Sequence, residues 1–163
     1  MKKRKVMICK TNEKGKGVSA KGFIKKGEVV VSGKVVKKLK QRTSHSFQVD
    51  VDTHVQLDIV SRSINHSCEP NIGVLNNVSG AYDFIALRDI QNGEEITWDY
   101  ETTEYISISV QKCLCGSSVC RKTIKGFIYL SISTILKYNG FIAEYLKELL
   151  IKNIGQREYY ESN

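Results

Sequence analysis

Three cysteines near the C-terminal third constrain this chain more than any other feature. Cys113, Cys115 and Cys120 lie within eight residues, and Gly116 eases the bend between them. Such clustering, within an odd total of five cysteines, indicates metal binding in a reducing compartment rather than a disulfide framework. Structural zinc takes four soft ligands in a tetrahedron. No His lies near this loop, so a fourth ligand must come from a distant segment.

Cys9 and Cys68 are the two candidates for that ligand. Cys68 lies in the polar segment Asn65-His66-Ser67-Cys68-Glu69-Pro70-Asn71, a suitable setting for a ligand, whereas Cys9 follows Val6-Met7-Ile8 and is typical of a strand. We therefore expect a structural zinc site formed by Cys68, Cys113, Cys115 and Cys120. The alternative is a set of reduced, unliganded thiols.

Length and hydropathy place the chain among single-domain proteins. Its 163 residues are enough to bury a core, and no run of 18 apolar residues is present. Residues 1–5 are basic, but the apolar stretch after them ends at Lys10 and is too short for a signal peptide. We expect an intracellular, cytoplasmic protein without a membrane partner, whereas the oligomeric state is not fixed by the sequence.

Charge is distributed unevenly along the chain. Residues 1–42 carry 15 Lys and Arg against 2 acids, and residues 43–110 carry 2 against 11. The basic region is either a weak contact for a polyanion such as nucleic acid or a solvated lysine-rich face. The acidic region would attract a cationic substrate, such as a lysine-bearing peptide.

Short strands fill the first half of the sequence, and helices are expected near the end. Alternating apolar residues over 47–57, with a turn at Asp52-Thr53, predict a hairpin. Ala20-x-x-x-Ile24-x-x-Gly27-Glu28 matches Ala86-x-x-x-Ile90-x-x-Gly93-Glu94, which suggests two similar β-units in one sheet system. From Phe127 on, apolar residues recur at helical spacing, and Asn139-Gly140 separates two short helices.

An ordered set of motifs resembles the SET-domain protein lysine methyltransferases. Each of four segments matches one family motif in the family's order. They are Lys14-Gly15-Lys16-Gly17-Val18 for the first cofactor motif, Arg62 to Asn71 for the central one, Gly93 to Tyr100 for the catalytic strand and turn, and Cys113 to Phe127 for the post-SET zinc loop. Since flanking regulatory domains are missing, we expect a small free-standing member of bacterial type.

The resemblance implies a mostly β fold with C-terminal helices. In it, small curved sheets surround a pseudoknot, where the Asn65–Asn71 and Tyr100 segments pass close together. We expect the SET domain at residues 1–110, the post-SET zinc loop at 111–127, and a helical extension packed on the same domain at 128–163.

The resemblance also implies S-adenosylmethionine as methyl donor and a protein lysine, in a histone or another basic protein, as acceptor. Tyr100 would be the catalytic residue that holds the transfer geometry. The cofactor-binding residues would be Gly15, Lys16, Gly17, Arg62, Asn65, His66, Tyr100 and Leu114. Arg62 would either meet the methionine carboxylate or form a structural pair.

Two residues in the expected substrate channel depart from the family pattern. Trp98 stands where Phe or Tyr is usual, and its bulk predicts mono- or dimethylation. His45, followed by Phe47, stands near a usual tyrosine and either lines the channel or only belongs to a hairpin. Two other readings remain for the chain: a catalytically silent SET-like binding module, and a small zinc-containing nucleic-acid binder.

Overall fold

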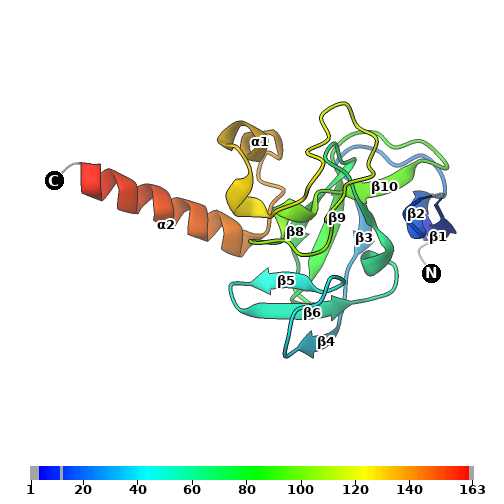
Figure 1. Ribbon diagram of the computed structural model, residues 1–163. Coiled ribbons are helices and arrows are strands. Elements are labelled where there is room, and N and C mark those ends of the chain that lie inside the picture. The colour runs from blue at the N-terminus through cyan, green and yellow to red at the C-terminus, as the bar shows by residue number, and fades with distance from the viewer. Residues whose placement is uncertain (1–3, 12, 162–163) are drawn as a thin grey trace.

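A computed structural model describes residues 4–11 and 13–161 of the chain, with side chains as far as residue 152. Three small β-sheets form the body, and the helices follow at the C-terminal end (Figure 1). Within the described residues, no helix combines the length and apolarity needed to cross a membrane. The expected mostly β fold of small sheets is confirmed.

The first sheet brings together strands from the start, the middle and the end of the β region. Its order is β1 (Val6–Lys10), β2 (Lys16–Ala20), β10 (Glu95–Trp98), β7 (Asn65–His66). β1, β2 and β10 are antiparallel, whereas β7 runs parallel to β10 with Asn65 opposite Thr97 and His66 opposite Trp98. The parallel pair is short, and both of its strands lead directly into residues of the candidate site.

The other two sheets have three antiparallel strands each. One has the order β3 (Val29–Ser32), β9 (Tyr82–Ala86), β8 (Ile72–Asn76), and the other has the order β4 (Val35–Leu39), β6 (Thr53–Leu57), β5 (Phe47–Asp50). Both are rich in β-branched and aromatic residues, which suit a pleated, half-buried surface. The hairpin expected over 47–57 is confirmed, with its turn one residue earlier than predicted because β6 already begins at Thr53.

The two similar segments noted in the sequence pair with each other. Ile24 and Ile90 exchange two backbone hydrogen bonds of 2.9 Å. Gly27 N donates to Ala86 O at 2.8 Å, and Gly93 N donates to Ala20 O at 2.9 Å. Equivalent positions of the two copies therefore meet in a nearly two-fold arrangement, which joins the first sheet to the second. Ile24 and Ile90 are both buried, so this joint lies in the core.

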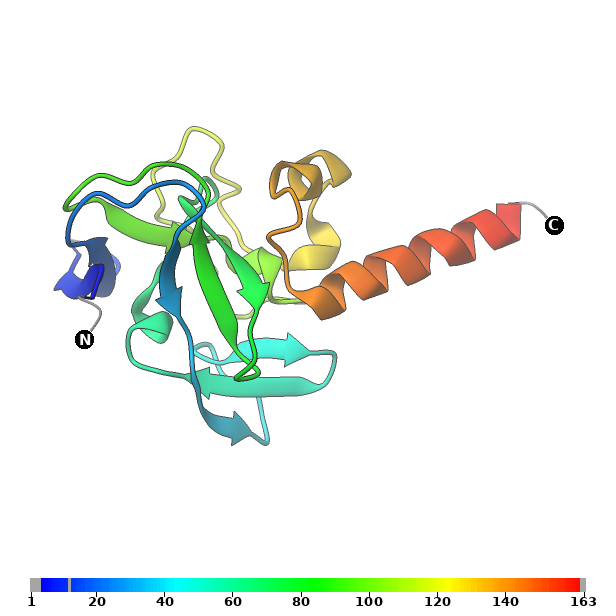
Figure 2. The same cartoon turned by 180° about the vertical axis from the view of Figure 1, so that it is seen from behind.

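Five helical segments complete the fold of the residues that the structure describes. They are the 3-10 turns η1 (Ser61–Ser63), η2 (Tyr100–Thr102) and η3 (Phe127–Tyr129), and the helices α1 (Ile132–Lys137) and α2 (Glu144–Glu161). Tyr145 and Leu146 bury the first turn of α2, whereas Ile151 is exposed. α2 is longer than the short helix expected, and it projects from the body on the side opposite the N-terminal strands (Figure 2).

Backbone and side-chain bonds hold the central segment against the strand that precedes Tyr100. Asn71 N donates to Thr97 O, and the Asn71 side chain accepts from Thr97 N at 2.9 Å while donating to Glu95 O at 2.8 Å. Ser67 N donates to Trp98 O at 3.0 Å. The expectation that the 65–71 and Tyr100 segments lie together is confirmed, and Asn71 is the residue that ties them.

Candidate active site and metal site

Four sulfur atoms from two distant segments form one cluster. Cys68 follows β7, and Cys113, Cys115 and Cys120 lie on the loop before η3. Their Sγ atoms all lie within 4.8 Å of one another. A tetrahedral zinc with Zn–S bonds of about 2.3 Å needs sulfurs roughly 3.8 Å apart, so this donor set fits structural zinc and could hold the ion. Cys9 lies outside the cluster, which confirms Cys68 as its fourth member.

Hydrogen-bond donors surround the sulfur of Cys68. Arg121 N donates to it at 3.3 Å, and His66 Nε2 lies 3.3 Å away. His66 Nδ1 accepts from Tyr100 N at 3.2 Å, so the ring proton belongs on Nε2, facing the sulfur. Burial, helped by the positive charges of Arg121 and Lys14, lowers the pKa of His66 to about 3 and keeps the ring neutral. The His66 ring thereby links the cluster to the backbone of Tyr100.

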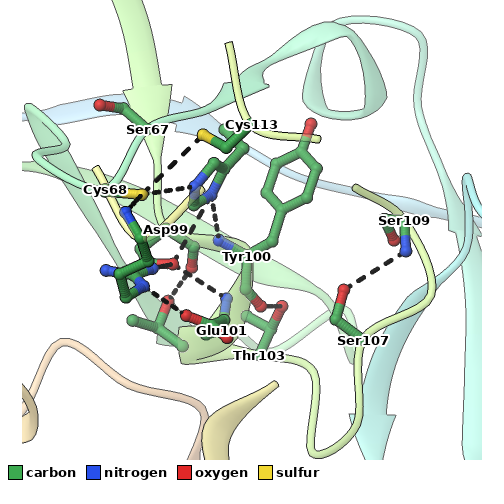
Figure 3. A network of polar contacts seen from close by, with 12 residues as sticks. Ser67, Cys68, Asp99, Tyr100, Glu101, Thr103, Ser107, Ser109 and Cys113 are labelled. Atoms are coloured by element: carbon green, nitrogen blue, oxygen red, sulfur yellow. Dashed lines mark hydrogen bonds and ion pairs between the residues drawn. The ribbon is translucent and has the colours of Figure 1, made fainter. Parts of the chain in front are cut away.

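A buried ion-pair network joins the cysteine loop to both neighbours of Tyr100. Arg121 Nη2 donates to the two carboxylate oxygens of Asp99 at 2.7 and 2.6 Å, and Arg121 Nε lies 2.6 Å from Glu101 Oε2 in a charge contact. Asp99 also accepts from the Tyr138 hydroxyl. Burial raises the pKa of Asp99, and Arg121 acts in the opposite direction. In Figure 3 the phenol of Tyr100 points away from Asp99 and Glu101.

The second oxygen of Glu101 fixes the chain just after the cysteine loop. Glu101 Oε1 accepts from Lys125 N and Gly126 N, both at 2.7 Å. Spacing alone did not single out Asp99, Glu101 or Arg121 as site residues. The available signal was that two acids flank Tyr100 in an apolar strand end while one cation directly follows a predicted metal ligand.

Tyr100 is the first residue of η2, and its side chain is half-buried. Its hydroxyl donates to Ile64 O at 2.9 Å, and its ring lies 4.8 Å from that of Trp98 and 5.3 Å from that of His66. Burial, and then the negative charge of Glu95, raises the pKa of Tyr100, so the phenol keeps its proton at neutral pH. A protonated, positioned hydroxyl suits a hydrogen-bonding role.

A cavity of about 560 Å³ opens beside Tyr100. Six of the residues proposed from the sequence for cofactor binding line it: Lys16, Arg62, Asn65, His66, Tyr100 and Leu114. Its volume lies in the range of small-molecule sites. Lys14 and Lys112 also line it, so four cationic side chains face the cavity. Of these four, only Lys14 has an ion-pair partner among the described residues, namely Glu95 at 2.6 Å. Such a lining suits a ligand with a carboxylate, and the half-exposed Leu114 offers an apolar surface for a planar ring.

Gly15 and Gly17 do not line this cavity, although the sequence placed them with the cofactor residues. Gly15 has φ of +74° and closes the β1–β2 turn. A Cβ on Gly17 would lie 2.6 Å from the Thr11 methyl and 3.0 Å from Asn65 Nδ2. Gly17 therefore leaves room for the Asn65 side chain, which donates to Lys16 O and Glu95 Oε1.

A second, narrow cavity of about 40 Å³ adjoins the first. The three residues predicted for a substrate channel, His45, Phe47 and Trp98, all line it, together with Tyr100 and Glu104. Phe47 stacks on Trp98 with ring centroids 5.6 Å apart. His45 is exposed on the loop before β5, and it lines both cavities.

Several carboxylates of the acidic middle segment are used inside the fold. Asp99, Glu101 and Glu104 are buried, Glu94 pairs with Arg88, and Asp58 accepts from backbone N–H groups and Ser61. Net charge per segment overlooks this internal use of carboxylates. The expectation that this segment attracts a cationic substrate stays a prediction.

Comparison with known proteins adds family information to this geometry. Residues 15–101 match the SET domain. Histone-lysine N-methyltransferase Set2 of Drosophila melanogaster is 32% identical in an alignment 139 residues long, which covers 73% of this chain and 6% of that protein. An H3 lysine-9 specific histone-lysine N-methyltransferase of Schizosaccharomyces pombe is 32% identical in an alignment 160 residues long, which covers 73% of this chain and 32% of the relative. The chain thus spans less than a third of either relative.

Solved structures show the same fold. SUVH6 of Arabidopsis thaliana, determined in complex with SAM, has a TM-score of 0.62 and 22% identity over 75% of this chain and 33% of its own. KRYPTONITE in complex with mCHG DNA and SAH has a TM-score of 0.58 and 24% identity over 73% of this chain and 28% of its own. At this identity the likeness concerns the fold.

Proposed function

Because the chain belongs to the SET-domain family, we propose that it is a protein-lysine N-methyltransferase that uses S-adenosylmethionine. One observation carries the proposal: Tyr100, Asn65, His66 and Leu114 line a single cavity directly beside the four-cysteine cluster. The matched relatives are named as histone-lysine methyltransferases, so a histone or another basic protein is the proposed acceptor.

The donor, when bound, supplies an activated methyl group on a positively charged sulfur. A neutral lysine amine attacks the methyl carbon, the N–C bond forms, and the C–S bond breaks with its electron pair going to sulfur. Tyr100, which lines both cavities, orients this in-line arrangement through its protonated hydroxyl. Holding the reacting groups in line supplies much of the acceleration.

Residues of the larger cavity have separate proposed tasks. Arg62 carries no ion pair among the described residues and lines the cavity, which favours binding of the donor's carboxylate over a structural pair. Leu114 covers the adenine, and the zinc bound by its neighbours Cys113 and Cys115 holds that loop in place. Zinc has no part in the chemistry.

Trp98 sets the proposed product. It is 2% exposed and packed by the rings of Phe47, Phe84 and Tyr100, so it has no room to move aside. One or two methyl groups on the substrate nitrogen would already fill the narrow cavity beside it. We expect mono- or dimethyllysine, and mass spectrometry showing mainly trimethyllysine would contradict this.

A transfer assay tests the function. Zinc-loaded protein is incubated with tritium-labelled S-adenosylmethionine and a panel of histones and ribosomal proteins, beginning with histone H3. Label on lysine is expected with the wild type and at least about 100-fold less with Tyr100→Phe, which removes one positioned polar group. Donor binding without transfer to any protein would support a silent module. Salt-dependent DNA or RNA binding without donor binding would support a nucleic-acid binder.

A further inference from the structure

One buried carboxylate beside the narrow cavity has no role in the steps above. Glu104 is 5% exposed, and of the described residues that line this cavity it alone carries a carboxylate. Carboxylates are rarely buried without a paired charge. A charge kept in such a place needs either a structural or a chemical reason.

The cavity connects Glu104 to the site of methyl transfer. Tyr100, Arg62, His45, Ser44 and Ser109 line both the narrow cavity and the large one. A space of about 40 Å³ holds about one to three water molecules, so a short chain of water can connect the groups that line it. A lysine side chain that approached Tyr100 through this cavity would therefore bring its nitrogen near Glu104.

Only one oxygen of Glu104 is used by the fold. Oε1 accepts from Gln48 N at 2.9 Å, which holds β5 against the turn after Tyr100. Oε2 accepts no hydrogen bond among the described residues, and its nearest basic group, His54 Nε2, lies 4.0 Å away. In the same cavity, Trp98 Nε1 is a buried donor without a partner among those residues. Glu104 Oε2 is thus left to accept from a substrate ammonium or a bridging water, and Trp98 Nε1 is left to donate to such a water.

The surroundings leave Glu104 able to change protonation state near neutral pH. Burial raises its pKa to about 7, against the opposing effects of the Gln48 bond and Arg42. Burial lowers the pKa of His54 on β6, so this ring gives no fixed positive partner. Tyr82 on β9 and Tyr145 on α2 face it as neutral phenols, since burial raises the pKa of both.

We propose that Glu104 takes up the proton that the substrate lysine must lose, directly or through a water in the narrow cavity. This inference rests on the proposed function and assigns the proton acceptor for that reaction. The lysine ammonium loses an N–H bond, and an O–H bond forms on Glu104. The freed electron pair then forms the N–C bond to the methyl carbon while the C–S bond breaks. Glu104 returns its proton to solvent after the product leaves.

Glu104→Gln tests the proposal because the amide oxygen can still accept from Gln48 N while the basic oxygen is lost. Rates are measured in single turnover from pH 6 to 10, with histone H3 or whichever protein of the panel is labelled most strongly. We expect a loss of about 100-fold at pH 7, within the usual effect of a general base. The ratio of the wild-type rate to the Glu104→Gln rate should fall about tenfold per pH unit above 7. The reason is that the fraction of free amine of a lysine with pKa near 10.4 rises at that rate, and the variant depends on it.

A structural role predicts a different profile. If the rate ratio of wild type to Glu104→Gln is constant across pH, or if the two proteins are equally fast, the inference is wrong although the proposed function stands. Absence of transfer by the wild type would instead defeat the function itself. Glu28→Gln, at an exposed pair with Lys5, is the matched control and should follow the wild-type profile.

A second measurement does not depend on activity and follows the wild-type protein itself. Carbon-13 NMR of the side-chain carboxyl carbons in the wild type, with Glu104 assigned by comparison with Glu104→Asp, follows its titration directly. An inflection near pH 7 is expected. Titration below about pH 5 would leave the group ionised throughout and unable to hold the proton, which would overturn the proposal.

Discussion

Replacing Arg121 with methionine tests how the cysteine loop supports the catalytic turn. The change removes the only cation that contacts Asp99 and Glu101 in the described part of the chain and leaves both carboxylates buried, at 1% and 2% exposure. Breaking a buried pair by removal of one partner costs about 3–5 kcal/mol, because the remaining charge is uncompensated. For a domain of this size, that predicts a fall in Tm of about 6–20 °C.

Thermal unfolding followed by circular dichroism measures this, with zinc content determined on the same sample. The backbone N–H of Arg121, which donates to Cys68, is unchanged in the variant, so we expect one zinc per chain together with the lower Tm. The Tm of Arg121→Lys should lie between those of the wild type and Arg121→Met, since a single ammonium cannot reach both carboxylates as a guanidinium does. Lys5→Ala breaks an exposed pair and should leave Tm unchanged.

A zinc-loaded Arg121→Met protein with Tm within about 2 °C of the wild type would refute this reasoning. The network would then be no stronger than a surface pair, and the loop could not hold the residues on either side of Tyr100. Loss of zinc in the variant would also contradict it, because the Arg121 side chain would then be needed mainly to hold the metal site rather than the turn around Tyr100.

Three further predictions concern the metal, the donor and the phenol. Cys113→Ser should lose the single zinc measured by plasma mass spectrometry, whereas Cys9→Ser should keep it; an equal metal content in both would remove the assignment. Gly17→Ala places a Cβ against Asn65 and should weaken S-adenosylmethionine binding at least about tenfold, an effect of roughly 1.4 kcal/mol. Calorimetry measures the affinity, and an unchanged value would show that Asn65 does not contact the donor. Tyr100→Phe should bind the donor normally, and near-normal turnover would refute its catalytic role.

The sequence was most predictive where short-range pattern and chemistry agreed. Alternation over 47–57 predicted its hairpin, and the spacing of three thiols predicted a cluster that Cys68 completes. Such features depend on local geometry and on ligand type, and both can be read from residue identities. The two repeated segments were found too, although only the fold showed that they pair with each other.

Long-range polar partners could not be predicted in the same way. Asp99 and Arg121 are 22 residues apart, and neither pattern nor spacing marks them as a pair. The acids of the middle segment were interpreted from net charge as a surface, whereas burial turned several of them into internal partners. Glu104 went unnoticed for the same reason, because a carboxylate becomes informative only when its burial and its cavity are known.

A crystal structure of the zinc-loaded chain with S-adenosylhomocysteine is the most direct test of the site as a whole. We predict the thioether sulfur in the large cavity beside the Tyr100 hydroxyl, the ligand carboxylate near Arg62, and one metal ion among the sulfurs of Cys68, Cys113, Cys115 and Cys120. A ligand bound elsewhere on the surface, or four cysteines without metal, would contradict the account.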